Sequence, residues 1–233
     1  PTGPQVLSAD DQSVLNNPGQ RAAKARELGR LKSKDAVPLL IGFCNDPDAE
    51  VRLACVQALG EIGHPDGVQA LRVRVFDEDV RVREAAALGL GLLYDETACN
   101  GLVDALKDKD SRVRLAAIRS LAPHSDAEAI EGLTQVFRDA DSVASVRLAA
   151  VEALAGQSAE AAAGGLRRAL SDADAAVRLA AVKGLAHRGD PTAYSALAQA
   201  LTDADPSVRA AAGAIVRKIG KPLLQYMEKT LAN

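Results

Sequence analysis

The chain has 233 residues, of which 48% are hydrophobic and 25% charged, as in an ordinary folded protein. Its net charge of −3 and pI of about 5.7 argue against nucleic-acid binding, because basic residues that neutralise phosphate supply most of that affinity. No apolar run approaches the roughly 18 residues that a membrane-spanning helix needs, so no membrane partner is expected. Aromatic residues make up only 3% and Trp is missing, which predicts a core of Ala, Leu, Val and Ile between closely approaching helices.

Arginine followed by a run of small apolar residues recurs at a fixed interval. Consecutive copies lie 31 residues apart, except for one step of 33, and they begin at Arg21, Arg52, Arg83, Arg114, Arg147, Arg178 and Arg209. A period of this size is typical of solenoids, in which each repeat buries its apolar face only against its neighbours. We therefore predict an all-α fold, a right-handed α-solenoid of about seven helical hairpins with a 31-residue period, forming a single domain over residues 1–233.

The two ends of the chain depart from this repeat. Residues 1–17 carry only a weak helical pattern, between Ala9 and Leu15, and are predicted to form a degenerate N-terminal cap, since terminal repeats of solenoids are atypical. Residues 139–145 contain the two extra residues of the longer step and are predicted to form a lengthened turn between helices. Residues 222–232 are predicted to form an amphipathic C-terminal capping helix.

Each full repeat is predicted to be a pair of helices, as residues 66–91 illustrate. A first helix begins at Asp66, whose carboxylate is expected to cap the first turn, and continues through Val75. After an acidic turn at residues 77–79, a second helix extends from near Val82 to about Leu93.

The second helix has a recognisable core stripe. Val51, Cys55, Leu59 and Ile62 step by four, four and three residues, so they share one helical face. Equivalent stripes contain Val113, Ala117 and Leu121, and then Val177, Ala181 and Leu185. Glycine occupies one position late in several second helices, where it is expected to permit close packing or to loosen the exit from the helix: Gly29, Gly60 and Gly91.

The motif Asp-x-x-Val-Arg marks the start of second helices, as at Asp48, Asp110, Asp174 and Asp205. Together with the small residues and the Leu-Gly that follow, it resembles the short HEAT-like repeats of phycobilin lyase subunits and many bacterial proteins, from about Arg21 to Arg217. The resemblance implies a bacterial protein whose second helices line the concave face. It also implies the main alternative function, a bilin lyase-like or chromophore-handling subunit that acts with a partner.

The repeated Asp and Arg residues indicate either a track for phosphate or carboxylate groups or a structural device. A binding site occurs once in most proteins, whereas this combination recurs in every repeat. We therefore expect the aspartates to cap the second helices and the arginines to bind carboxylates and carbonyl groups of adjacent turns.

Positions two, six and ten residues after the repeat Val are rotated roughly 200–280° from the core stripe and are expected to face the concave surface. Leucine recurs at the first of these positions. Aligned exposed leucines would form a partner surface, whereas the alternative is that each Leu packs between adjacent second helices. The predicted partner-binding residues are Leu53, Glu84, Leu88, Leu92, Leu115, Arg119, Leu148, Glu152, Leu179 and Lys183, with Arg26, Arg30, Arg81 and Arg112 at the rim.

The sequence contains no glycine-rich phosphate loop, no Gly-x-Ser-x-Gly and no His-Glu-x-x-His, so no catalytic residue is predicted. The histidines, His64, His124 and His187, lie about one repeat or more apart, too far to share one metal ion, and are expected on the surface. The cysteines, Cys44, Cys55 and Cys99, occupy apolar repeat positions and are expected to be buried free thiols.

These observations predict a non-catalytic cytoplasmic scaffold, without metal or cofactor, that binds a protein or peptide along its concave face. A preformed curved surface needs little ordering on binding, which favours this function. Self-association of the solenoid remains a further possibility, and bilin lyase-like activity is left open as the alternative.

Overall fold

Pairs of helices joined by short turns make up the described chain. The computed structural model describes residues 17–93, 96–137, 142–158, 160–188 and 191–220, and these residues contain helices and turns but no strand. The chain divides into two compact units, Pro1–Ser120 and Leu121–Asn233, which we describe separately. The all-α prediction is confirmed, while the right hand of the superhelix, the number of repeats and the single domain remain predictions.

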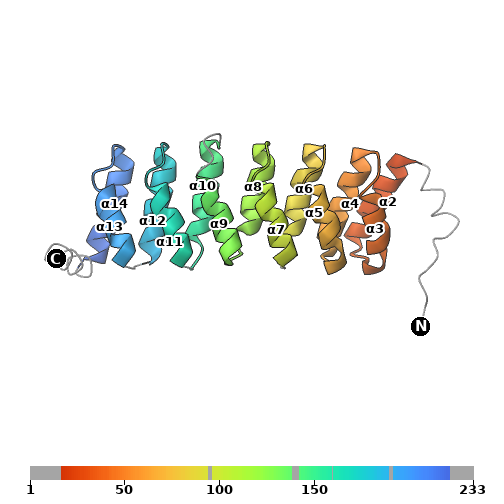
Figure 1. Ribbon diagram of the computed structural model, residues 1–233, viewed down its shortest axis with the longest axis horizontal. Helices are drawn as coiled ribbons and strands as arrows, with labels where there is room; N and C mark the ends of the chain where they lie inside the picture. The colour runs from red at the N-terminus through yellow and green to blue at the C-terminus, as the bar shows by residue number, and fades with distance from the viewer. Residues whose placement is uncertain (1–16, 94–95, 138–141, 159, 189–190, 221–233) are drawn as a thin grey trace. The chain divides into compact units, whose positions relative to one another are not determined.

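The helices of the first unit stack in two layers. In one layer α4 packs along α2 and α6, and in the other layer α5 packs along α7. Figure 1 shows α2, α4 and α6 as successive second helices of neighbouring repeats. The helices are α2 (Pro18–Arg30), α3 (Val37–Phe43), α4 (Ala49–Ile62), α5 (Val68–Arg74), α6 (Val80–Leu90), α7 (Glu96–Ala105) and α8 (Ser111–Leu121), with 3₁₀ helices at Lys34–Ala36 and Pro65–Gly67.

The second unit has the same arrangement. α12 packs between α10 and α14, and α11 packs between α9 and α13. Its helices are α9 (Ala127–Gln135), α10 (Ala144–Ala155), α11 (Glu160–Ala169), α12 (Ala175–Arg188), α13 (Pro191–Ala200) and α14 (Pro206–Ile219). The helix predicted between Ala9 and Leu15 and the capping helix predicted at 222–232 lie outside the described residues.

The predicted core stripe is confirmed. Val51, Cys55, Leu59 and Ile62 are all buried, as are the equivalent residues of α8 and α12. Each fully buried Leu or Val of this kind contributes about 1.5–3 kcal/mol, so the repeated stripe is a main source of stability.

Glycine allows the second helices to approach one another closely, as the sequence predicts. A Cβ atom at Gly60 of α4 would lie 2.9 Å from the Cα of Gly89 in α6. A Cβ atom at Gly29 of α2 would lie 2.8 Å from the Cα of Ala58 in α4, and one at Gly91 would collide with the side chain of Ser120. These contacts leave no room for a side chain at the helix crossings.

The predicted cap at Asp66 is wrong. Pro65 begins a short 3₁₀ helix, so Asp66 lies inside that turn rather than before a helix. The backbone N–H of Asp66 donates to Nδ1 of His64, which caps the turn at 3.3 Å. The following helix, α5, begins at Val68 without a side-chain cap. The second helix of this repeat begins two residues earlier than predicted, at Val80, where Asp79 caps it.

Candidate partner-binding surface

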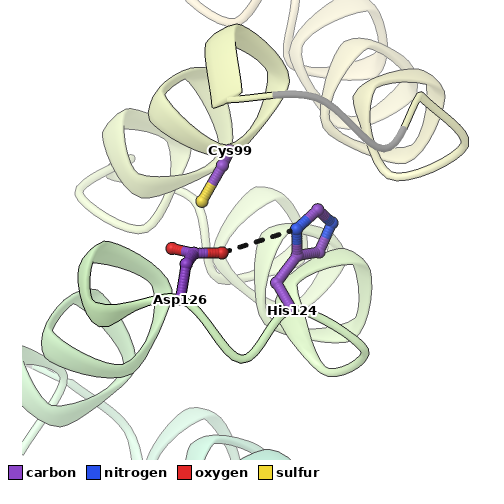
Figure 2. Close-up of side chains that lie close together, drawn as sticks. All are labelled: Cys99, His124 and Asp126. Carbon is purple, nitrogen blue, oxygen red and sulfur yellow. Dashed lines mark ion pairs between the residues drawn. The ribbon is translucent and has the colours of Figure 1, made fainter.

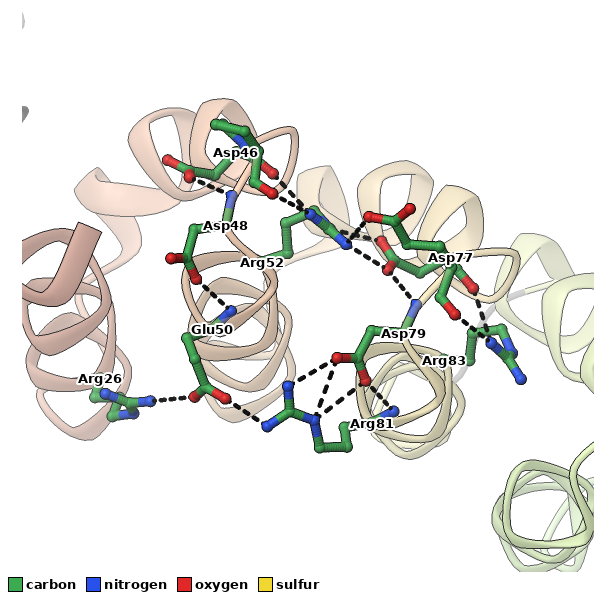
Figure 3. A network of polar contacts seen from close by, with 11 residues as sticks. Arg26, Asp46, Asp48, Glu50, Arg52, Asp77, Asp79, Arg81 and Arg83 are labelled. Carbon is green, nitrogen blue, oxygen red and sulfur yellow. Dashed lines mark hydrogen bonds and ion pairs between the residues drawn. The ribbon is translucent and has the colours of Figure 1, made fainter.

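A ladder of arginine–aspartate pairs connects consecutive repeats. The guanidinium of Arg52 donates from Nε and Nη2 to the two oxygens of Asp77, both at 2.9 Å. Its Nη1 donates to the backbone carbonyls of Asp46 and Pro47, both at 3.0 Å. Figure 3 shows this arginine between the turns of two neighbouring repeats. Its Nη2 also donates to Oε1 of Glu78 at 2.9 Å, so each N–H group of the guanidinium has a partner in the protein.

The same rung recurs with a spacing of 25 residues between its partners. Nε–Oδ2 distances of 2.6–2.9 Å occur in the pairs Arg21–Asp46, Arg52–Asp77, Arg83–Asp108, Arg147–Asp172 and Arg178–Asp203. In the Asp-x-Asp turns, the second aspartate caps the following helix: Asp48, Asp79, Asp110, Asp174 and Asp205 each accept a backbone N–H two residues on. These contacts agree with the structural interpretation of the Asp and Arg repeat, and they occupy groups that an anion track would need.

The longer repeat interrupts this device. Within the part of the chain that the structure describes, Arg114 donates to the carbonyls of Asp108 and Lys109, and its buried Nε has no partner. Asp139, which follows Arg114 by 25 residues, lies outside the described residues. α10 begins after Val143, which supplies no side-chain cap. Within the described residues, α10 therefore lacks the aspartate cap that begins the second helices of other repeats.

The low pKa values of the aspartates in these turns make the stability of the protein sensitive to acidification. Burial by itself would raise the pKa of Asp77, but hydrogen bonds from Arg52 and from the N–H of Asp79 hold it below the usual range, and Asp46 and Asp172 behave alike. Hydrogen bonds from Arg81 and Arg112 lower the pKa of Asp79 and Asp110 to about 2.

We expect the stability of the protein to fall on acidification below about pH 4. Unfolded aspartate has a pKa of about 3.9, so the stabilisation is present above that pH and is lost as the pH falls through the lower folded values, towards about pH 2. Urea unfolding midpoints measured at a series of pH values test this. A midpoint that stays constant from about pH 5 to about pH 2.5 would contradict it.

The predicted leucine line is half-buried. Leu53, Leu115, Leu148 and Leu179 all have intermediate exposure, as does Glu84 at the same repeat position. Leu179 packs against the core cluster that contains Val182 and Leu197. This burial agrees with the alternative in which each Leu packs between neighbouring helices, and the line is therefore a poor candidate for an exposed apolar strip.

The other two predicted positions are exposed wherever they are described. In the first unit, the residues six positions after the repeat Val, or after Gln20 in its place, form a middle row: Arg26, Gln57, Leu88 and Arg119. The residues ten positions after it form an end row: Arg30, Glu61 and Leu92. Leu88 is 47% exposed and Leu92 is 62% exposed, one turn apart. In the second unit, Glu152 and Lys183 hold the middle position and are exposed. Half of the predicted partner-binding residues thus lie on open surface.

Two adjoining hollows lie on these rows between α2 and α4. The smaller, of about 290 Å³, is lined by Arg26, Arg30, Ala54, Gln57, Ala58 and Glu61. The larger, of about 530 Å³, shares Arg30 and Glu61 and is lined further by Gly29, Lys32, Gly60, Ile62, Gly63 and Leu92. Lys32, with a φ of 50°, was missed by the sequence reasoning because it follows α2 and lies off the helical period.

Charges at the N-terminal ends of the second helices neutralise one another. The carboxylate of Glu50 pairs with Arg26 at 3.4 Å and also with Arg81, which in turn pairs with Asp79 at 2.7 Å (Figure 3). Arg112 pairs with Asp110 at 3.0 Å. Among the residues the structure describes, Arg30, Lys32 and Arg119 form no such ion pair, so this face keeps unpaired positive charge at Arg30 and Arg119 of the rows and at Lys32 beside them.

The predicted surface position of His124 is wrong, because its side chain is only 8% exposed. Figure 2 shows it facing the carboxylate of Asp126, with Nδ1 and Oδ2 3.8 Å apart. His64 is partly exposed, and the side chain of His187 is outside the part of the chain that the structure describes. The prediction of buried free thiols is confirmed for Cys44, Cys55 and Cys99, and burial raises the pKa of Cys44 to about 12.

The fold and this surface define a class of protein, the helical-repeat solenoids. The family model for HEAT repeats matches residues 13–75, 73–155, 140–217 and 164–232, so the chain belongs to the HEAT-repeat family. No curated protein sequence matches the chain significantly. In the described residues, no helix has both the length and the apolar character needed to cross a membrane.

Solved structures with the same fold differ widely in sequence. YibA from E. coli is 19% identical, with a TM-score of 0.60 over 88% of this chain and 77% of that one. A chain from the complex of CpcE and CpcF of phycocyanin lyase from Nostoc is 22% identical, with a TM-score of 0.52 over 98% and 97%. A designed armadillo repeat protein in complex with a (KR)4 peptide is 19% identical, with a TM-score of 0.53 over 79% and 99%.

Proposed function

We propose that the chain is a non-catalytic scaffold that binds a protein or peptide on the second-helix face of its first unit. The observation that carries the proposal is the pair of exposed leucines, Leu88 and Leu92, beside hollows lined by charged side chains. Exposed apolar residues with a polar rim are typical of partner surfaces. A rigid stack of helices needs little ordering on binding, which favours affinity.

The first unit offers a matched pair of variants for the test. Leu88 on the second helix α6 and Val73 on the first helix α5 are both apolar and both 47% exposed. Aspartate at either position adds the same charge without opening a cavity in the core. The two variants therefore differ mainly in the face that they change.

Peptides selected from a random display library against the immobilised full chain provide the ligand. We expect Leu88→Asp to raise the Kd of such a peptide at least about tenfold, and Val73→Asp to leave it within about twofold, because central apolar contacts dominate binding energy. Fluorescence anisotropy measures the Kd, and far-UV circular dichroism checks that both variants fold. A selected peptide whose affinity responds to Val73→Asp and not to Leu88→Asp would place binding elsewhere.

The second candidate is a bilin lyase-like or chromophore-handling subunit that acts with a partner. Its support is the likeness over nearly the whole chain to a component of the CpcE and CpcF complex. The three cysteines of the chain are all buried and offer no ready thiol for bilin attachment. Titration with a linear tetrapyrrole decides this candidate: an absorbance shift supports it, and an unchanged spectrum with and without a candidate partner subunit counts against it.

A further inference from the structure

The exposed rows of the first unit have an ordered chemistry from one second helix to the next. α2 presents Arg26 and Arg30, α4 presents Gln57 and Glu61, α6 presents Leu88 and Leu92, and α8 presents Arg119. Basic groups thus lie at both ends of the series and an apolar pair lies between them. The contact of Ser120 Oγ with the carbonyl of Ala87, at 3.1 Å, holds α8 beside α6.

Charge on these rows is unbalanced, although the whole chain is acidic. The exposed cations on the rows are Arg26, Arg30 and Arg119, Lys32 lines the hollow beside them, and the exposed carboxylate on the rows is Glu61. Arg26 shares Glu50 with Arg81, while the other three cations form no ion pair within the described residues. A ligand with negative charge at its ends would therefore supply partners that the chain itself does not.

We infer that the ligand of this face is an extended acidic peptide with one apolar anchor. The inference rests on the proposed function and specifies the class of partner. The anchor lies against Leu88 and Leu92, one acidic group lies by Arg30 and Lys32, and a second lies by Arg119. Charge-assisted hydrogen bonds from guanidinium groups to carboxylates provide the specificity, and the leucine pair provides apolar burial.

The helix spacing sets the spacing of the peptide residues. Packed helices lie about 8–10 Å apart, so the crossing from α2 to α6 is about 16–20 Å and the step from α6 to α8 about 8–10 Å. An extended chain rises about 3.3 Å per residue. The first acidic group is therefore about five or six residues from the anchor, and the second is about three residues beyond it.

A labelled peptide of about twelve residues tests this spacing, with two Glu at one end, a Phe about six residues later and two more Glu about three residues beyond. We expect the full chain to bind it at least about tenfold more tightly than the same peptide with Lys for Glu or with its residues scrambled. Binding is expected to weaken as salt is raised, because the charges are exposed. Equal affinity for the three peptides would overturn the inference.

Two double variants remove the same charge from different places. Arg30→Gln with Lys32→Asn is expected to raise the Kd of the acidic peptide about tenfold, because both cations line the hollow. Lys107→Gln with Lys109→Asn, at exposed positions after α7, is expected to leave the Kd within about twofold. Equal effects of the two variants would show that only net charge matters and would overturn the inference.

The remaining outcomes separate this inference from the proposed function. Displacement of the acidic peptide by a single-stranded oligonucleotide of equal affinity would assign the face to nucleic acid and overturn the peptide inference. Display-selected peptides that depend on Leu88 but carry no acidic residues would overturn the inference and leave the proposed function standing. If no selected peptide depends on Leu88, both fail.

Discussion

Replacing Arg52 by Ala is expected to destabilise the first unit by about 1.5–3 kcal/mol, since the buried carboxylate of Asp77 then keeps only Arg74, at 3.1 Å, and the N–H of Asp79 as partners. The side chains of Arg52 and Asp77 are 5% and 2% exposed, so their hydrogen bonds form largely out of contact with water. The carbonyls of Asp46 and Pro47 lose their donor as well. A loss of this size is a large part of the 5–15 kcal/mol that stabilises a typical domain.

Arg81→Ala is the matched control for this experiment. Arg81 also bonds aspartate and glutamate, but its side chain is 49% exposed, so the substitution is expected to cost no more than about 1 kcal/mol. Urea unfolding followed by far-UV circular dichroism measures both variants. If Arg52→Ala costs no more than Arg81→Ala, the ladder does not hold the repeats together.

Gly60→Ala is expected to destabilise the protein by about 1–3 kcal/mol, although alanine favours helices more than glycine does. The new methyl group would lie 2.9 Å from the Cα of Gly89, so α4 and α6 would have to separate. Since the obstacle is backbone, no side-chain rotation relieves it. The cost of overpacking therefore exceeds the gain of about 1 kcal/mol in helix propensity.

Gly42→Ala in α3 tests the same substitution without the obstacle. No atom lies within 4 Å of the added Cβ, so this variant is expected to gain up to about 1 kcal/mol. Thermal and urea unfolding of the two variants are compared. Stabilisation by both substitutions would show that the α4–α6 contact yields easily and that close approach is not required.

Local periodicity predicted the core stripe and the caps because both depend on residues within one helix. Val51 and Leu59 are buried, and Asp48 caps α4, as their spacing indicates. The sequence predicted that the arginines bind carboxylates and carbonyl groups but not which ones. The pairing of Arg52 with Asp77, 25 residues further on, depends on how one repeat stacks on the next.

Contacts between repeats, together with local turn geometry, explain what the sequence did not predict. The half-burial of Leu115 depends on how closely neighbouring second helices approach, and the burial of His124 depends on the turn after α8. The position of Lys32 in a hollow depends on its positive φ after the end of α2. Asp66 was mistaken for a cap because Pro65 starts a 3₁₀ helix before the α-helix.

The central claim is that partners bind the exposed rows of the second helices in the first unit. Amide hydrogen exchange of the full chain, followed by mass spectrometry with and without a saturating selected peptide, tests it most directly. We expect added protection on α2, α4, α6 and α8, with α3, α5 and α7 unchanged. Protection confined to α3, α5 and α7, or to helices of the second unit, would contradict the claim.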